Sequence, residues 1–157
     1  MDKNIPRWIK SSVVKWFSDQ FSNNDLYFYL EGCDRRTDTK RQYVEFRLDG
    51  PYSRELSHNY WEFAIDIDIL IVTIRNETDI YEHDRGIGLV CAAFVPGIPV
   101  WKYGDTSDDD PTVQVGCLRV IPKDQGRIVV TNFGQVRNDS RLLQSTVEAY
   151  YKLNLRT

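Results

Sequence analysis

The sequence predicts an α+β fold, a mainly antiparallel β-sheet with two packed α-helices at about residues 6–21 and 78–94. Three observations predict it. Apolar residues recur at helical spacing in those two segments, apolar and polar residues alternate over residues 60–74, and hairpin-like turns replace regular strand-to-helix crossovers. Because the 157 residues contain no internal repeat or break in composition, we expect one domain spanning residues 1–157.

The first helix is predicted from a proline followed by an amphipathic pattern. Pro6 suits the first turn of a helix, where a missing N–H group costs nothing. The apolar residues that follow at helical spacing are Ile9, Val13, Trp16, Phe17 and Phe21. The polar segment Ser22-Asn23-Asn24-Asp25 then ends the helix.

Three strands are expected in the next part of the chain. Residues 26–30 form a short apolar run, and residues 44–48 alternate before the turn signal Asp49-Gly50-Pro51. Residues 60–74 give the clearest pattern. One parity carries Trp61, Phe63, Ile65, Ile67, Ile69 and Ile71, and the other carries Glu62, Asp66 and Asp68. This alternation is typical of a long strand with one buried face.

The second helix is predicted to begin at Thr78, whose side chain can cap it, and to end at residue 94 before Pro96-Gly97. Gly86 and Gly88 weaken this prediction, so either they allow close packing on the sheet or the helix is shorter. Strands are expected at 113–121 and 127–133, and the alternation from Val147 to Leu155 predicts a closing strand.

The composition excludes several classes of protein. Hydrophobic residues at 41% and charged residues at 27% indicate a folded globular chain, and the 13% aromatic content favours protein–protein interfaces. A net charge of −3 argues against a protein that grips nucleic-acid phosphates. Cys33, Cys91 and Cys117 form no paired motif, so we expect a reducing compartment, and no signal peptide or membrane segment is evident.

We expect a protein that is not an enzyme, because the sequence contains none of the common catalytic motifs. The chain lacks the nucleophile-elbow, zinc-protease, phosphate-loop and dinucleotide-binding motifs, and no cofactor or metal is expected. His58 and His83 are the only histidines. His83-Asp84 with Cys91 suggests a Cys/His site, but a half-buried helix histidine and a buried thiol in the core explain the same residues.

Three interpretations of Glu62, Asp66 and Asp68 remain open. They form a solvent-exposed strand face, or an assembly or channel surface that repels DNA phosphates, or a cation or acid–base site. An enzyme of the last kind, a small hydrolase or nuclease, would lose metal-dependent turnover on Asp66→Ala or Asp68→Ala.

Charged loops are the candidate docking sites. The loops expected at 31–41, 50–59 and 97–112 are long for a small domain, and long connections are commonly functional. The charged side chains singled out in them are Arg35, Arg36, Lys40, Arg41, Asp108, Asp109 and Asp110. The acidic loop 105–110 lacks the glycine and closing glutamate of a calcium loop, so a solvated loop or docking surface is expected there.

The order of these features resembles the tail terminator, or tail completion, proteins of tailed bacteriophages. The segments that carry the resemblance are the helix around residues 8–21, the strand YWEFAIDIDILIVT, the helix TDIYEHDRGIGLVCAAF and the strand STVEAYYKLNL. The resemblance is one of pattern over most of the chain, and it transfers no individual functional residue. Neck proteins of the same virions share this architecture.

The resemblance implies a structural protein of the virion, assembled in the host cytoplasm. Subunits of this family form a hexameric ring that caps the tail tube and joins it to the head connector. The implied partners are further copies of the chain, the tail tube protein and the neck proteins, with genomic DNA passing through the lumen without specific binding. Two alternatives remain open, a head-closure or connector protein of the neck and a cytosolic ligand-binding module.

Overall fold

The computed structural model describes residues 2–22, 27–31, 42–74, 81–94, 97–104, 111, 113–120, 128–137 and 139–156. In chain order the elements are α1 (Ile5–Phe21), β1 (Tyr27–Leu30), β2 (Tyr43–Ser57), β3 (Tyr60–Ile74), α2 (Glu82–Phe94), β4 (Ile98–Lys102), β5 (Val113–Val120), β6 (Val129–Val136) and β7 (Asp139–Arg156). The α+β class is confirmed. Neither helix of the described residues has the length and apolar character needed to span a membrane.

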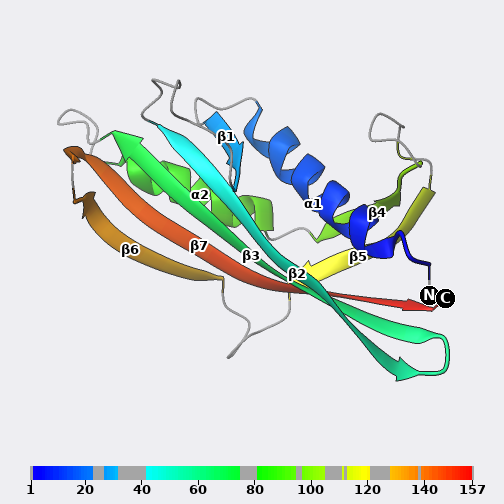
Figure 1. Cartoon of the computed structure of the whole chain (residues 1–157). Helices are drawn as coiled ribbons and strands as arrows, with labels where there is room; N and C mark the ends of the chain where they lie inside the picture. The colour runs from blue at the N-terminus through cyan, green and yellow to red at the C-terminus, as the bar shows by residue number, and fades with distance from the viewer. Residues whose placement is uncertain are drawn as a thin grey trace.

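The sheet is built around two long central strands, β3 and β7. They pair antiparallel without interruption from Tyr60 opposite Arg156 to Ile74 opposite Leu142. The strand order is β1-β2-β3-β7-β5-β4, and β6 also pairs with β7. Figure 1 shows β2, β3 and β7 as long, twisted neighbours with both helices on the same side of them. The sheet therefore has one face covered by helices and one uncovered face.

The alternation predicted for residues 60–74 is confirmed, and it builds the core. Phe63, Ile65, Ile67, Ile69 and Ile71 are all buried beneath the helices. Burying each such side chain contributes about 1.5–3 kcal/mol.

One aromatic ring joins three elements at the centre of this core. The ring of Phe17 on α1 lies 4.9 Å from that of Phe46 on β2 and 5.2 Å from that of Phe94 on α2, measured between centroids. Tilted and edge-on contacts of this kind stabilise beyond the burial of area alone. Phe17 therefore fixes both helices against the sheet.

The last carbonyl groups of α2 accept hydrogen bonds from side chains of other elements. Trp16 Nε1 donates to the Ala93 carbonyl at 3.0 Å, and the Tyr151 hydroxyl donates to the Phe94 carbonyl at 2.8 Å. A helix C-terminus leaves its final carbonyls without intrahelical partners, and a buried carbonyl left unpaired destabilises the fold. Burial also raises the pKa of the Tyr151 phenol, so this donor keeps its proton.

The expectation of a mainly antiparallel sheet is partly wrong, because the sheet is mixed. β1 runs parallel to β2, with Tyr27 opposite Tyr43 and Leu30 opposite Phe46. The remaining paired strands of the described residues are antiparallel. Sequence alternation reveals which residues share a face but not the direction of a neighbouring strand.

The turn expected at Asp49-Gly50-Pro51 is also wrong. β2 continues through these residues to Ser57, with a register shift between Asp49 and Tyr52. Gly50 has φ +108°, and a Cβ atom there would lie 3.0 Å from the Ala64 carbonyl oxygen. The glycine therefore allows a β-bulge. Glycine and proline within a strand are as typical of a bulge as of a turn. The docking loop expected at 50–59 is largely strand, and the chain reverses at His58-Asn59.

Other boundaries differ from the prediction in smaller ways. α1 begins at Ile5 and ends at Phe21 as expected, whereas α2 begins at Glu82, and the expected cap Thr78 lies outside the described residues. Both glycines lie within α2, Gly86 buried and Gly88 exposed. The loop expected at 97–112 contains β4. Pro99 weakens the strand signal of this segment in the sequence, but β4 lies at the edge of the sheet, where proline is tolerated.

Candidate functional site

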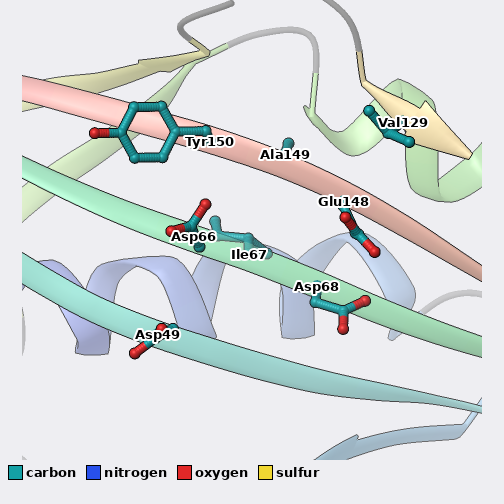
Figure 2. A pocket seen from close by; sticks show the side chains of 8 residues that line it. All are labelled: Asp49, Asp66, Ile67, Asp68, Val129, Glu148, Ala149 and Tyr150. Atoms are coloured by element: carbon teal, nitrogen blue, oxygen red, sulfur yellow. The ribbon is translucent and has the colours of Figure 1, made fainter. Parts of the chain in front are cut away.

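The uncovered face of the sheet carries a hollow lined mainly by carboxylates. Its volume is about 390 Å³, and its lining residues are Asp49, Asp66, Ile67, Asp68, Val129, Glu148, Ala149 and Tyr150. Figure 2 shows the acidic side chains on β2, β3 and β7, with a helix behind these strands. Because side chains alternate along a strand, the parity opposite the buried isoleucines places Asp66 and Asp68 on this face.

Strand register brings the acids of three strands together. Asp66 on β3 lies opposite Asp49 on β2 and opposite Tyr150 on β7. Two residues further along β3, Asp68 lies opposite Glu148 on β7. Directly opposed side chains in antiparallel strands have Cβ atoms about 4.5–5.5 Å apart. Four carboxylates therefore occupy two adjacent rows of the sheet.

The surroundings of Asp68 disfavour its ionised form. Burial raises the pKa of Asp68, and the nearby charge of Glu148 raises it further, while Arg47 lowers it. Asp68 Oδ1 is buried and has no hydrogen-bond partner among the described residues. Arg47 does not fully neutralise the hollow, because its guanidinium also contacts Glu45, at 3.3 Å. The site thus holds carboxylates close together, with Glu148 opposite Asp68 on β7 and Arg47 opposite it on β2.

Tyr52 shows that the negative field extends to the edge of the hollow. A hydrogen bond to Asp49 is the main cause that raises the pKa of the Tyr52 phenol, with smaller contributions from burial and from the charges of Asp49 and Asp66. Without the bulge at Gly50, Tyr52 and Asp49 would lie on opposite faces of the sheet. The bulge shifts the register by one residue, so both lie on the same face. The bulge therefore shapes this end of the site.

The structure separates one of the three predicted face residues from the other two. Glu62 lies nearer the hairpin end of β3, where it forms ion pairs with Arg54 at 3.1 Å and with Lys152 at 3.2 Å. Its charge is compensated, and it does not line the hollow. Asp66 and Asp68 remain as the central pair.

Sequence reasoning missed Asp49 and Glu148 as members of this site. The sequence predicts a turn at Asp49, because Gly50-Pro51 is as typical of a turn as of the bulge that keeps Asp49 in a strand. Glu148 falls on the polar parity between Val147 and Ala149, so its exposure could be read from the sequence. Its position opposite Asp68 depends on register, which the sequence does not specify.

A second polar cluster lies inside the core and centres on His83. Thr73 Oγ1 lies 2.6 Å from His83 Nδ1, and Ser145 Oγ lies 2.7 Å from His83 Nε2. The Ser145 hydroxyl also donates to Asn132 Oδ1 at 3.0 Å. His83 is 4% exposed and Ser145 0% exposed, so no substrate reaches this serine.

The protonation state of this cluster follows from its donors. Gly134 N–H and Ser145 O–H both donate to Asn132 Oδ1, so the serine proton is not available to His83. Nε2–H of His83 must then donate to Ser145, and Nδ1 accepts from the Thr73 hydroxyl. Burial lowers the pKa of His83, which agrees with a neutral ring.

The Cys/His site considered from the sequence does not form around His83. Both ring nitrogens are engaged, by Thr73 and Ser145, so neither is available to activate Cys91. Burial raises the pKa of the Cys91 thiol, which disfavours a reactive thiolate. The interpretation of His83 as a core histidine is confirmed, and the ring is more deeply buried than expected.

The remaining predicted site residues cannot be placed. Arg35, Arg36, Lys40, Arg41, Asp108, Asp109 and Asp110 lie outside the described residues. Within the described ranges, no group of three His, Cys, Asp or Glu side chains has a geometry that could hold a metal ion. The acidic hollow is therefore described by its field, which attracts cations and repels phosphates.

Comparisons with known proteins bear on the fold. No protein-family profile matches the chain, and no curated protein matches it. Several solved structures are similar to the chain, and one of them has 13% sequence identity and a TM-score of 0.54 over 94% of each chain. This likeness extends over nearly the whole chain and concerns its fold alone.

Proposed function

We propose that this chain is a structural subunit that assembles with copies of itself into a ring, and that the ring belongs to the head–tail junction of a tailed bacteriophage. The resemblance of its sequence pattern to tail terminator proteins motivates the phage assignment. The observation that best supports a ring is the uncovered, acid-lined face of the sheet. In this proposal that face lines the lumen.

The proposed role of the acids is to keep DNA from binding as it passes. Asp49, Asp66, Asp68 and Glu148 present like charges on one face, and DNA phosphates carry the same sign. Repeating this face around a ring sums the potential of every subunit. Because the screening length is about 8 Å at physiological ionic strength, the repulsion acts close to the wall and leaves the channel axis passable.

Solution mass and imaging test this proposal. The purified protein is measured by sedimentation over a range of concentrations, and negative-stain images are recorded with and without tail tubes. We expect one closed stoichiometry and rings that cap the tube ends. Rings that bind only portal complexes would move the assignment to a head-closure or connector role.

A monomer at every concentration, with tubes and portals present, would contradict the proposal. It would favour the ligand-binding alternative, for which a stoichiometric small ligand in the acidic hollow is the expected finding. The tube experiment therefore separates the three functions by stoichiometry and by partner.

A further inference from the structure

We infer that neighbouring copies join edge to edge, with β6 of one copy pairing antiparallel with β1 of the next, so that one sheet continues through the assembly. This inference rests on the proposed function, because it names the contact through which copies assemble. The contact centres on Val130 of β6 and Leu30 of β1. Figure 1 shows these strands at the two outer sides of the long central strands.

The first argument comes from one row of the sheet. Val130 lies opposite Val147, and the row continues through Ile69 and Phe46 to Leu30. The three inner members of the row are buried at 0–1% exposure, whereas Leu30 is 39% and Val130 44% exposed. A buried row thus ends in exposed apolar side chains at both edges. Where two copies meet, Val130 of one copy and Leu30 of the next cover each other, and the buried row continues from one copy into the next.

The second argument comes from strand direction. β1 and β2 are parallel, and each of the pairs β2–β3, β3–β7 and β7–β6 is antiparallel. β1 and β6 therefore run in opposite directions within one copy. When two copies lie in the same orientation, β6 of one meets β1 of the next antiparallel, which is the commoner and more stable pairing. The same orientation keeps every acidic hollow on one side.

The third argument comes from charge. Edge strands of soluble proteins are commonly protected from pairing by charged residues or proline. The edge strand β4 contains Pro99 and Lys102, and the part of β2 beyond β1 carries Arg47, Asp49, Arg54 and Glu55. β1 (YFYL) and β6 (VVTNFGQV) contain no charged residue and no proline. The two outer strands without a charge or a proline are therefore the two whose directions match.

The bulge in β6 limits the length of the contact. The register of β6 on β7 shifts between Asn132 and Gly134, so the regular part of the strand covers residues 129–132. β1 is also four residues long. The two edges therefore match in length as well as in direction and charge. Each contact joins two copies by itself, and ring closure adds to the stability of the full assembly.

A mixing experiment tests this contact. Val130→Lys blocks the β6 edge and Leu30→Lys blocks the β1 edge, because a lysine here places a charge where the partner strand must pack. Each variant alone should be monomeric under conditions where the unmodified chain forms rings. When mixed, each pair retains one open β6 and one open β1. We expect heterodimers of twice the 18.4 kDa subunit mass and nothing larger.

Leu56→Lys is the matched control, because Leu56 is 42% exposed but lies on the charged part of β2. It should assemble as the unmodified chain does. Circular dichroism checks that each variant is folded, and Val130→Glu with Leu30→Glu replaces any lysine variant that is not.

The failures are distinguishable. If the unmodified chain never assembles, the proposed function falls. If it assembles but each variant forms homodimers, or the mixture gives no heterodimer, or Leu56→Lys also abolishes rings, only the β6–β1 contact is overturned.

Discussion

Asp68 and Glu148 are directly opposed on neighbouring strands of the uncovered face, two carboxylates where an ordinary sheet pairs opposite charges. Burial and the charge of Glu148 both raise the pKa of Asp68, so the folded state is destabilised by keeping this residue ionised. Like charges in this position commonly cost about 0.2–1 kcal/mol. In our account the opposed carboxylates help the channel to repel DNA phosphates, and they lower the stability of the subunit.

Asp68→Asn should therefore stabilise the isolated subunit. The expected gain is about 0.5–1 kcal/mol at pH 7, or about 1–4 °C in Tm for a domain of this size. An acid whose folded pKa is raised destabilises the fold above that pKa and ceases to do so as pH falls below the unfolded value of 3.8. The advantage of the variant should thus shrink in acid.

Thermal melting of both proteins from pH 7 to pH 4 measures this effect. Glu62→Gln is the control, because Glu62 is paired with Arg54 and Lys152, and its loss should destabilise slightly or leave Tm unchanged. Equal stabilisation by both substitutions would refute the electrostatic explanation.

His83→Gln should weaken the fold and remove part of its pH dependence. The substitution disturbs hydrogen bonds to Thr73 and Ser145 in the core, with an expected cost of about 2–3 kcal/mol. Because burial lowers the pKa of His83, the unfolded chain takes up a proton first, and stability should be lost as pH falls below 6.5.

Denaturant unfolding at pH 7.5 and pH 5.5 compares these proteins. His58→Gln is the matched control, since His58 lies at the exposed hairpin turn and this substitution should retain the pH dependence of the unmodified chain. A His83→Gln variant that keeps the full acid sensitivity would show that the sensitivity arises elsewhere.

Two glycine substitutions should have opposite signs. Gly50→Ala forces a Cβ atom to 3.0 Å from the Ala64 carbonyl oxygen at φ +108°, and we expect a loss of about 1–3 kcal/mol. Gly88→Ala lies in α2 with nothing within 4 Å of the new Cβ, so it should gain about 0.5–1 kcal/mol. Denaturant midpoints of the two variants measure this contrast, and stabilisation by Gly50→Ala would contradict the bulge described for β2.

Tyr151→Phe should destabilise by about 1–2 kcal/mol. It removes the hydroxyl that donates to the Phe94 carbonyl at 2.8 Å and leaves a terminal carbonyl of α2 buried without that partner. Tyr60→Phe, at a tyrosine that is 37% exposed, is the control and should change the free energy of unfolding by less than about 0.5 kcal/mol. Equal losses in the two variants would indicate that the buried bond contributes nothing specific.

The sequence predicted those parts of the fold that depend on local periodicity. The alternation around Ile65 and the helical spacing around Val13 report which side chains face the core, and both are buried. The parallel direction of β1 and the bulge at Gly50 depend on tertiary pairing, and local sequence does not encode them uniquely. The first was missed because a four-residue strand has no direction signal, and the second because Gly-Pro also signals a turn.

The candidate site divides in the same way. Asp66 and Asp68 were predicted to share a face, because the period of a strand fixes this. Their meeting with Asp49 and Glu148, and the separation of Glu62 into ion pairs, follow from the registers of β2 and β7 on β3. Register is a property of the folded sheet, so the hollow itself could not be predicted.

An electron cryomicroscopy map of the assembled particle tests the central claim most directly. Our account predicts a closed ring in which the face carrying Asp66 and Asp68 lines the lumen, with α1 and α2 on the outer side. A ring whose lumen is lined by the helices, or a particle that never closes, would contradict it.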